Sequence, residues 1–232
     1  MDPNRFASRT PTLRSENVRL AGAGTRTVLV APERLAGWLE RFAASHGGVE
    51  VTAHADVVDA LAADGSAARC EVPFPPLPPG PGDPWQALVD HATRPRRLGV
   101  LLIRRGGYAA GVFDAGALVT SKVGSRYVQG RTAAGGTSQL RFARRRDNQA
   151  SALVDSATQV ALRILAPEAG RLAALVTGGD RPLVAAALAD PRLSRLAALP
   201  RGPWLAVGDP RLKVLREAGQ SARAVRITIT DG

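Results

Sequence analysis

The sequence predicts a mixed fold of the α/β (α+β) class, with a small N-terminal α/β domain, a proline-rich linker and a larger second domain. Two observations carry this prediction. Apolar residues recur at helical spacing in some stretches and at strand spacing in others, and a run rich in proline separates two such regions. With 232 residues, 45% of them hydrophobic, the chain is long enough to bury a core.

The N-terminal α/β domain is predicted over residues 26–72, after a flexible tail over residues 1–25 that shows no clear period. A helix is predicted from Pro32, because proline suits the first helical position, to Gly47, where a glycine pair stops it. Strands are predicted at residues 27–30, 49–53 and 67–72, and the stretch between the last two is ambiguous.

Residues 73–84 contain so many prolines that neither a helix nor a central strand is expected there, because proline removes the backbone donors that both require. We expect a stiff linker of the polyproline type. Proline-rich runs also serve as ligands for domains with aromatic grooves, but a position between two structured segments favours the linker.

The second domain is predicted over residues 85–232 as a mixed sheet with one long helix at about 139–165, which ends at Pro167. Short glycine-containing breaks predict an antiparallel meander of four strands. These strands cover residues 98–103, 108–113, 117–123 and 126–131. The remaining predicted elements are helices at 85–93, 182–188 and 210–218 and strands at 172–177, 204–207 and 224–229.

The positive charge is concentrated in the second domain. Residues 1–94 contain 9 Lys and Arg against 11 Asp and Glu, a net charge of −2, whereas residues 95–232 contain 22 against 9, a net charge of +13. A uniform compositional bias would not divide the chain in this way. The second domain is therefore the predicted binding region for a polyanion.

A block of one charge sign lies in the middle of this domain, because no acidic residue occurs between Asp114 and Asp147. A solvated surface normally mixes both signs, so this block favours contact with phosphate over a merely soluble basic face. The candidate RNA-binding residues are Lys122, Arg126, Arg131, Arg141, Arg144, Arg145 and Arg146.

Helical geometry separates the two ends of the long helix. At 100° per residue, Arg141, Arg144 and Arg145 fall in one narrow sector. The residues on the opposite side are Ala150, Leu153, Val154, Ala157, Ala161 and Ile164. Arg146 breaks the pattern, because it lies at the azimuth of the apolar residues. We therefore expect the first turns of the helix to overhang the body of the domain.

The loop before this helix is rich in small residues. It is the sequence Gln129-Gly130-Arg131-Thr132-Ala133-Ala134-Gly135-Gly136-Thr137-Ser138-Gln139. Paired glycines permit positive φ and remove side-chain bulk, so the backbone can approach a ligand closely with its N–H groups available. An ordinary turn between a strand and a helix would also use such glycines.

The combination of this loop with its flanks resembles a known family. Gly135-Gly136-Thr137-Ser138-Gln139, preceded by the segment 127–131 and followed by the basic segment 141–150, is similar to the release-factor-like peptidyl-tRNA hydrolases of ribosome quality control. Those proteins resemble the central domain of the eukaryotic and archaeal class I release factors, whose loop is Gly-Gly-Gln. The two extra residues, Thr137 and Ser138, occur in the quality-control branch. The resemblance covers about residues 95–232, and domains for codon reading have no counterpart in this sequence.

The resemblance implies a peptidyl-tRNA hydrolase that works on the large ribosomal subunit without a cofactor. It implies that Gln139 positions a water at the ester between peptide and tRNA, since a glutamine amide offers both an acceptor and a donor but does not titrate. The main-chain N–H of Gln139 would stabilise the developing oxyanion. The implied catalytic residues are Gly135, Gly136, Thr137, Ser138 and Gln139.

Conventional active sites have little support in the sequence. The three histidines, His46, His54 and His91, all precede the basic domain, and their spacing matches no zinc site. Ser138 has no neighbouring base that would make it a nucleophile. Cys70, the single cysteine, excludes an internal disulfide and is expected to be a buried apolar residue.

Two other functions remain open at this stage. The basic segment could dock on the large subunit without catalysis, or the domain could cleave the tRNA strand itself, although its only lysines are Lys122 and Lys213 and it has no histidine. The sequence contains no run of about eighteen apolar residues and no apolar leader after Met1, so we expect a cytoplasmic protein that contacts no membrane. We also expect a monomer with no bound metal.

Overall fold

The computed structural model describes residues 24–125 and 138–232, and it describes side chains for residues 24–125 and 148–232. Two five-stranded sheets with helices organise this part of the chain, which confirms the mixed α/β class. The expected tail lies outside the described residues except for Gly24 and Thr25, and the expected strand at residues 126–131 lies outside them too. No described helix is long and apolar enough to cross a bilayer.

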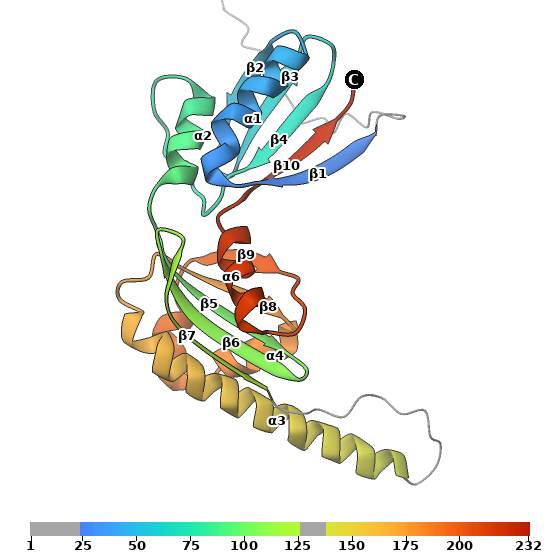
Figure 1. Cartoon of the computed structure of the whole chain (residues 1–232), viewed down its shortest axis with the longest axis vertical. Coiled ribbons are helices and arrows are strands. Elements are labelled where there is room, and N and C mark those ends of the chain that lie inside the picture. Colours follow the sequence, from blue (N-terminus) through green and yellow to red (C-terminus); the bar gives the residue numbers. More distant parts are fainter. Residues whose placement is uncertain (1–23, 126–137) are drawn as a thin grey trace, which may run out of the picture.

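The first sheet, with two helices on one face, forms what we call the N-terminal unit (Figure 1). Its strands, all antiparallel to their neighbours, are in spatial order β1 (Thr25–Val30), β10 (Val225–Thr230), β4 (Ala67–Glu71), β3 (Val57–Ala62) and β2 (Val49–Ala53). The helices are α1 (Pro32–Ser45) and α2 (Pro84–Thr93). Strand β3 fills the stretch that the sequence left ambiguous.

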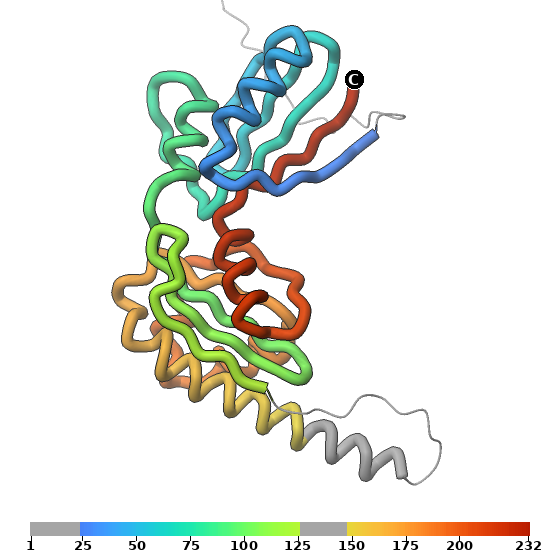
Figure 2. Tube along the Cα trace, viewed as in Figure 1, coloured from blue at the N-terminus to red at the C-terminus, as the bar shows by residue number. Residues whose placement is uncertain are grey.

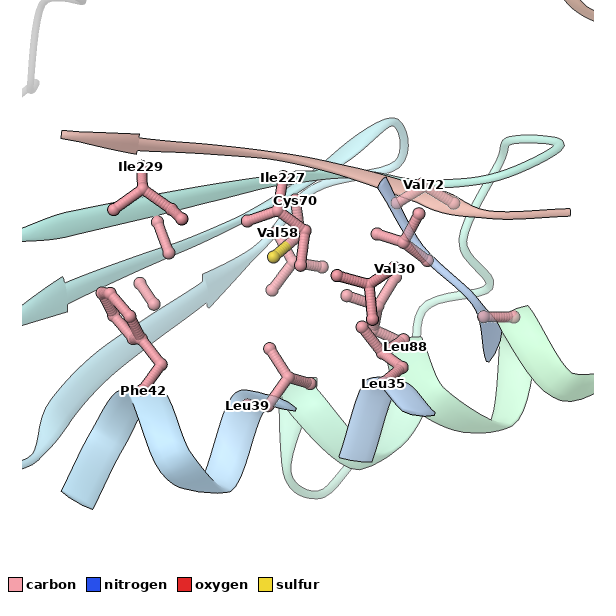
Figure 3. Packing of buried hydrophobic residues seen from close by; sticks show 14 of the residues in the cluster. Val30, Leu35, Leu39, Phe42, Val58, Cys70, Val72, Leu88, Ile227 and Ile229 are labelled. Carbon is pink, nitrogen blue, oxygen red and sulfur yellow. The ribbon is translucent and has the colours of Figure 1, made fainter. Parts of the chain in front are cut away.

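The core of the N-terminal unit lies between the sheet and the two helices. Leu35, Leu39 and Phe42 from α1 point at the sheet, and Ile227 and Ile229 point back from β10 (Figure 3). These side chains are fully or almost fully buried. Burial alternates along β10 with the period of two that a strand imposes, so one face of this strand belongs to the core.

Two elements that we expected in the second domain belong instead to the N-terminal unit. The final strand β10 lies between β1 and β4, and α2 contributes Leu88 and Ala92 to the first core. The period-2 pattern of β10 identifies a strand, but it is the same whichever sheet the strand joins. Strand pairing between residues about 200 positions apart, such as Val28 with Ile227, is decided only in the folded chain.

The proline-rich segment 73–84 is packed rather than free. Leu77 is buried in the core of the N-terminal unit, and its main-chain N–H donates to the Ala55 carbonyl at 2.6 Å. The ring of Phe74 packs against the core of the second sheet. The expectation of a spacer is therefore corrected, because the apolar residues among the prolines bind this segment to both cores.

The second sheet and the remaining helices form the C-terminal unit. Its strands are in spatial order β7 (Ala117–Ser125), β6 (Gly107–Asp114), β5 (Arg97–Arg104), β8 (Ala174–Gly179) and β9 (Arg201–Leu205). The first three form an antiparallel meander as expected, and β5, β8 and β9 are parallel. The helices are α3 (Ser138–Ile164), α4 (Arg181–Leu188), α5 (Ser194–Ala197) and α6 (Leu212–Ser221), with 3-10 turns η1 (Ala166–Glu168) and η2 (Pro191–Leu193).

Helices cover both faces of this sheet (Figure 1). Strand β5 contributes Leu101 and Ile103 to the core under α3, and Leu98, Val100 and Leu102 to the core under α6. All five are completely buried. This explains why the strand reads as a continuous apolar run in the sequence rather than as an alternating one.

The chain crosses between the two units twice, after α2 and after α6 (Figure 2). Close to the second crossing, the Arg223 guanidinium donates to the Glu33 carboxylate at 2.7 Å, so an ion pair links the start of α1 to the end of α6. Because β1 pairs with β10, the N-terminal unit contains strands from the early and the late part of the sequence.

Because β10 supplies the centre of the first sheet, Ile227→Ala is expected to lower the free energy of unfolding of the N-terminal unit by about 2–5 kcal/mol, the usual cost of such a cavity. Thr228→Ala, one residue away on the opposite face, is the matched control and is expected to cost less than about 1 kcal/mol. Urea unfolding followed by fluorescence of Trp38 and Trp85, which pack against this core, measures both. Equal losses for the two variants would contradict this placement of β10.

His91 of α2 holds the start of the proline-rich segment. Its Nε2 lies 2.9 Å from the Pro73 carbonyl oxygen, to which it can donate. Burial lowers the pKa of His91 below its ordinary value of 6.5, and the nearby charge of Arg96 lowers it further. The neutral imidazole is therefore the form that suits the folded state.

This shift has a definite sign for stability. The unfolded chain binds a proton at His91 near pH 6.5, whereas the folded chain binds it only at lower pH. The contribution of neutral His91 to the free energy of unfolding is therefore complete above pH 6.5, and it is lost as the pH falls toward the pKa of the folded state. Urea unfolding at pH 7.5 and 5.5 should show a decline of at most about 1.4 kcal/mol per pH unit from this group. His91→Gln keeps a donor for Pro73 but does not titrate, so its decline should be smaller than that of the wild type. An unchanged pH dependence in His91→Gln would rule out the assignment.

Candidate functional site

The described structure gives the two elements on either side of the predicted loop. Strand β7 precedes this loop and ends at Ser125. Ser125 pairs with Gly107, the first residue of β6, next to the turn between β5 and β6. Helix α3 begins at Ser138, in agreement with the helix predicted from the sequence. The loop residues between them, with Gly135, Gly136 and Thr137, lie outside the described residues, as do Arg126 and Arg131.

Ser138 and Gln139 form the first turn of α3 as far as the backbone is concerned. The first four N–H groups of an α-helix have no acceptor within the helix, and they carry the positive end of the helix dipole. No acidic residue lies in this first turn. Main-chain N–H groups at a helix start can donate to an oxyanion or a phosphate group. The side chains of residues 138–147, with Arg141, Arg144, Arg145 and Arg146, lie outside the described ones.

Helix α3 is anchored to the sheet through its later turns. Its own side chains Leu153, Ala157 and Ala161 are completely buried in the core that it forms with the sheet. Its described side chains from Asn148 to Ser151 are at least partly exposed. A helix of 27 residues is about 40 Å long, whereas the 8-residue strands below it are about 27 Å long. The sheet is thus too short to cover the helix along its whole length in a parallel arrangement.

Lys122 is the one predicted RNA-binding residue whose side chain is described. It is exposed on β7, directly opposite Ala110 of β6. Paired residues of neighbouring strands share a face of the sheet, and Ala110 belongs to the core under α3. Lys122 therefore lies on the face of the sheet that carries α3.

Three arginines that the sequence analysis did not single out lie near α3. Arg104, Arg105 and Arg181 line a cavity of about 570 Å³ together with Ala150 of α3. Arg104 donates to the Val207 carbonyl at 2.7 Å, and the Arg181 guanidinium lies 4.4 Å from the centre of the Trp204 ring. In the described part of the chain, none of the three has a carboxylate within ion-pair distance.

The same cavity contains two acidic residues, Asp180 and Asp209. Asp180 accepts a hydrogen bond from the main-chain N–H of Arg105, and Asp209 lies 3.9 Å from Arg211. In the sequence, Arg104, Arg105 and Arg181 appeared only as part of the excess positive charge of the second domain. That excess does not show where in the fold each arginine lies. Pairing of β5 with β8 brings Arg104 and Arg105 close to Arg181.

The three histidines and the single cysteine belong to the N-terminal unit. Burial raises the pKa of the Cys70 thiol to about 12, so this cysteine stays protonated and unreactive. Nδ1 of His46 lies 2.7 Å from the Asp64 carboxylate, and His91 is occupied with Pro73. Among the residues with described side chains, no group of three His, Cys, Asp or Glu could hold a metal ion.

Comparison with known proteins gives a family match and likenesses to solved structures. A family model described as Actinobacteria/chloroflexi VLRF1 release factor matches residues 96–228. The crystal structure of the archaeal translation termination factor aRF1 is similar with a TM-score of 0.38 and 14% sequence identity, over 88% of this chain and 68% of that chain. No curated protein matches the chain.

The cationic start of α3 leads to a test of binding. Arg144→Glu with Arg145→Glu should weaken binding to RNA and to large ribosomal subunits at least tenfold, and lower the slope of log affinity against log salt by about 2. The thermal unfolding midpoint should move by less than about 2 °C, since helical geometry predicts that both side chains face outward, where a substitution costs little stability. Arg195→Glu with Arg216→Glu, two exposed arginines elsewhere, is the control. An unchanged salt slope in the first pair would remove them from the interface.

Proposed function

The chain belongs to the Actinobacteria/chloroflexi VLRF1 release factor family, whose model matches residues 96–228 of its 232, and on this premise we propose that it is a peptidyl-tRNA hydrolase acting on the large ribosomal subunit. The enzyme cleaves the ester between the nascent peptide and tRNA and thereby frees stalled chains. The observation that carries the proposal is Gly135-Gly136-Thr137-Ser138-Gln139, which lies inside the matched region at the start of α3.

The proposed chemistry needs position rather than a titrating group. The ester is already an activated bond, and what it lacks is a correctly placed water. The side-chain amide of Gln139 can accept one hydrogen bond from such a water and donate another. Placing a reactant correctly contributes several kcal/mol to the rate, which accounts for catalysis without histidine, thiolate or metal.

The backbone at the start of α3 supports the second half of this chemistry. When water attacks the ester carbonyl, negative charge develops on the carbonyl oxygen and then on the leaving ribose oxygen. The main-chain N–H of Gln139 is one of the helix amides without an intrahelical acceptor, so it can donate to either oxygen. Gly135 and Gly136 allow the preceding backbone to approach the ester without side-chain bulk.

The proposed ribosome contacts are electrostatic and surround this loop. Lys122, Arg126, Arg131, Arg141, Arg144, Arg145 and Arg146 hold RNA phosphates, and the excess of positive charge over residues 95–232 attracts them from a distance. Arg104, Arg105 and Arg181 extend the same cationic surface beside α3. The partners are the large subunit with its RNA, and the peptidyl-tRNA as substrate.

One release assay tests the catalytic assignment. Purified protein added to large subunits that carry labelled peptidyl-tRNA should free the peptide and leave full-length tRNA with an intact 3′ end. Gln139→Ala should lower the release rate about 100-fold or more while binding to the subunit is retained, because it removes the amide but none of the arginines. Gly135→Ala and Gly136→Ala should do much the same by restricting the loop backbone.

Gln159→Ala, an exposed glutamine later in the same helix, is the matched control and should release peptide at the wild-type rate. Release at the wild-type rate by Gln139→Ala would refute the catalytic role and favour a docking factor. A shortened tRNA would show that the protein is a nuclease.

A further inference from the structure

The N-terminal unit has a free strand edge beside a cationic helix face. Among the described residues, β1 pairs only with β10, so its other edge presents unpaired main-chain N–H and C=O groups. Its pairing with β10 is regular over all six residues, without a register shift. It also contains no proline. Such an edge can accept another strand.

The other three sheet edges are protected, which makes β1 unusual in this chain. Strand β7 contains a register shift opposite Val112 and Phe113, and β9 contains Pro203 and an irregular pairing with β8. Strand β2 is short, and α2 packs beside it. Bulges and prolines are usual means of preventing strand addition, and within the described residues β1 has neither.

A groove of about 310 Å³ runs between this edge and α1. Its floor is apolar, from Val28, Leu29 and Val30 of β1. Its other wall is a single stripe of α1, with Arg34, Trp38 and Arg41 at helical spacing i, i+4 and i+7. The lining contains no acidic residue.

The two arginines of this wall form no ion pair with any described residue. In the described part of the chain, no carboxylate lies within ion-pair distance of Arg34 or Arg41. Trp38 between them is held in place, because its ring stacks on Phe42 at 5.5 Å with planes 7° apart. The groove thus combines a backbone template, a fixed aromatic ring and two unneutralised positive charges.

We propose that β1 and the Arg34-Trp38-Arg41 face of α1 form a docking site for an acidic, extended peptide segment of a protein partner. The peptide adds to the sheet as a strand next to β1, and its main chain pairs with the free edge. Apolar side chains on its inward face contact Trp38 and Val28, and acidic side chains reach Arg34 and Arg41. The site is independent of the hydrolase assigned to the C-terminal unit.

Charge distinguishes this occupant from the alternatives within the chain. Residues 1–23 contain four arginines and only two acidic residues, so they do not complement a groove lined by arginines. Two copies joined through β1 would bring Arg26, Arg34 and Arg41 of each copy toward those of the other. RNA would satisfy the arginines, but it has no peptide backbone to pair with the strand edge.

The test uses the full chain and a short synthetic peptide in which glutamate alternates with valine. Binding is followed by NMR of the β1 amides and the Trp38 indole, and by calorimetry. The Glu-Val peptide should shift these resonances, whereas a Lys-Val peptide and an analogue N-methylated at alternate amides should bind at least tenfold more weakly. The double variant Arg34→Glu with Arg41→Glu should bind the Glu-Val peptide at least tenfold more weakly than the wild type. Arg34→Lys with Arg41→Lys keeps both positive charges and should lose less affinity. Arg195→Glu with Arg216→Glu is the control and should bind the peptide like the wild type.

Several results would overturn the proposal. Equal binding of the N-methylated analogue would exclude strand addition, and equal binding of the Lys-Val peptide would exclude the charge requirement. A gain of more than tenfold in affinity after removal of residues 1–23 would make that segment the occupant. A dimer detected by light scattering, with the β1 amides in its interface by NMR, would make a second copy the occupant. Loss of RNA binding in Arg34→Glu with Arg41→Glu at unchanged peptide affinity would make RNA the occupant.

Discussion

Burial of strand β5 on both faces is the constraint on which the C-terminal unit depends. Its side chains alternate between the core under α3 and the core under α6, so both layers of helices are attached to one central strand. Gly99 shows how closely the layers approach, since a Cβ there would lie 2.8 Å from Leu172. The sheet can therefore act as a rigid base, and α3 is attached to that base by its later turns.

This arrangement suits a catalyst that works by placing main-chain and amide groups. Gln139 and the preceding glycines belong to the segment that enters a helix, where free N–H groups and the helix dipole coincide. The three histidines precede the basic region in the sequence, and the single cysteine is buried in the core of the N-terminal unit. The hydrolysis proposed for this region needs a substrate that is already activated.

The two units are tied together by the path of the chain. The last strand returns to the first sheet, and the ion pair between Arg223 and Glu33 spans the second crossing. The first sheet is complete only when β10, which follows the whole C-terminal unit in the sequence, has joined it. The same topology places β1 at the outer edge of the sheet, next to α1, and so creates the groove that we assign to an acidic peptide.

The sequence by itself determined the elements and the chemical character of each region. Apolar periodicity predicted α1, the meander from β5 to β7 and the long helix α3, because these patterns depend on neighbours a few residues away. Its charge distribution and the Gly-Gly-Thr-Ser-Gln motif indicated the family that the match to residues 96–228 shows. Only the tertiary structure decided that β10 and α2 belong to the first core, that Leu77 and Phe74 bind the proline-rich segment, and that Arg104 and Arg181 lie together. These are contacts between distant residues, and a strand or an arginine has the same local pattern whichever partner it meets.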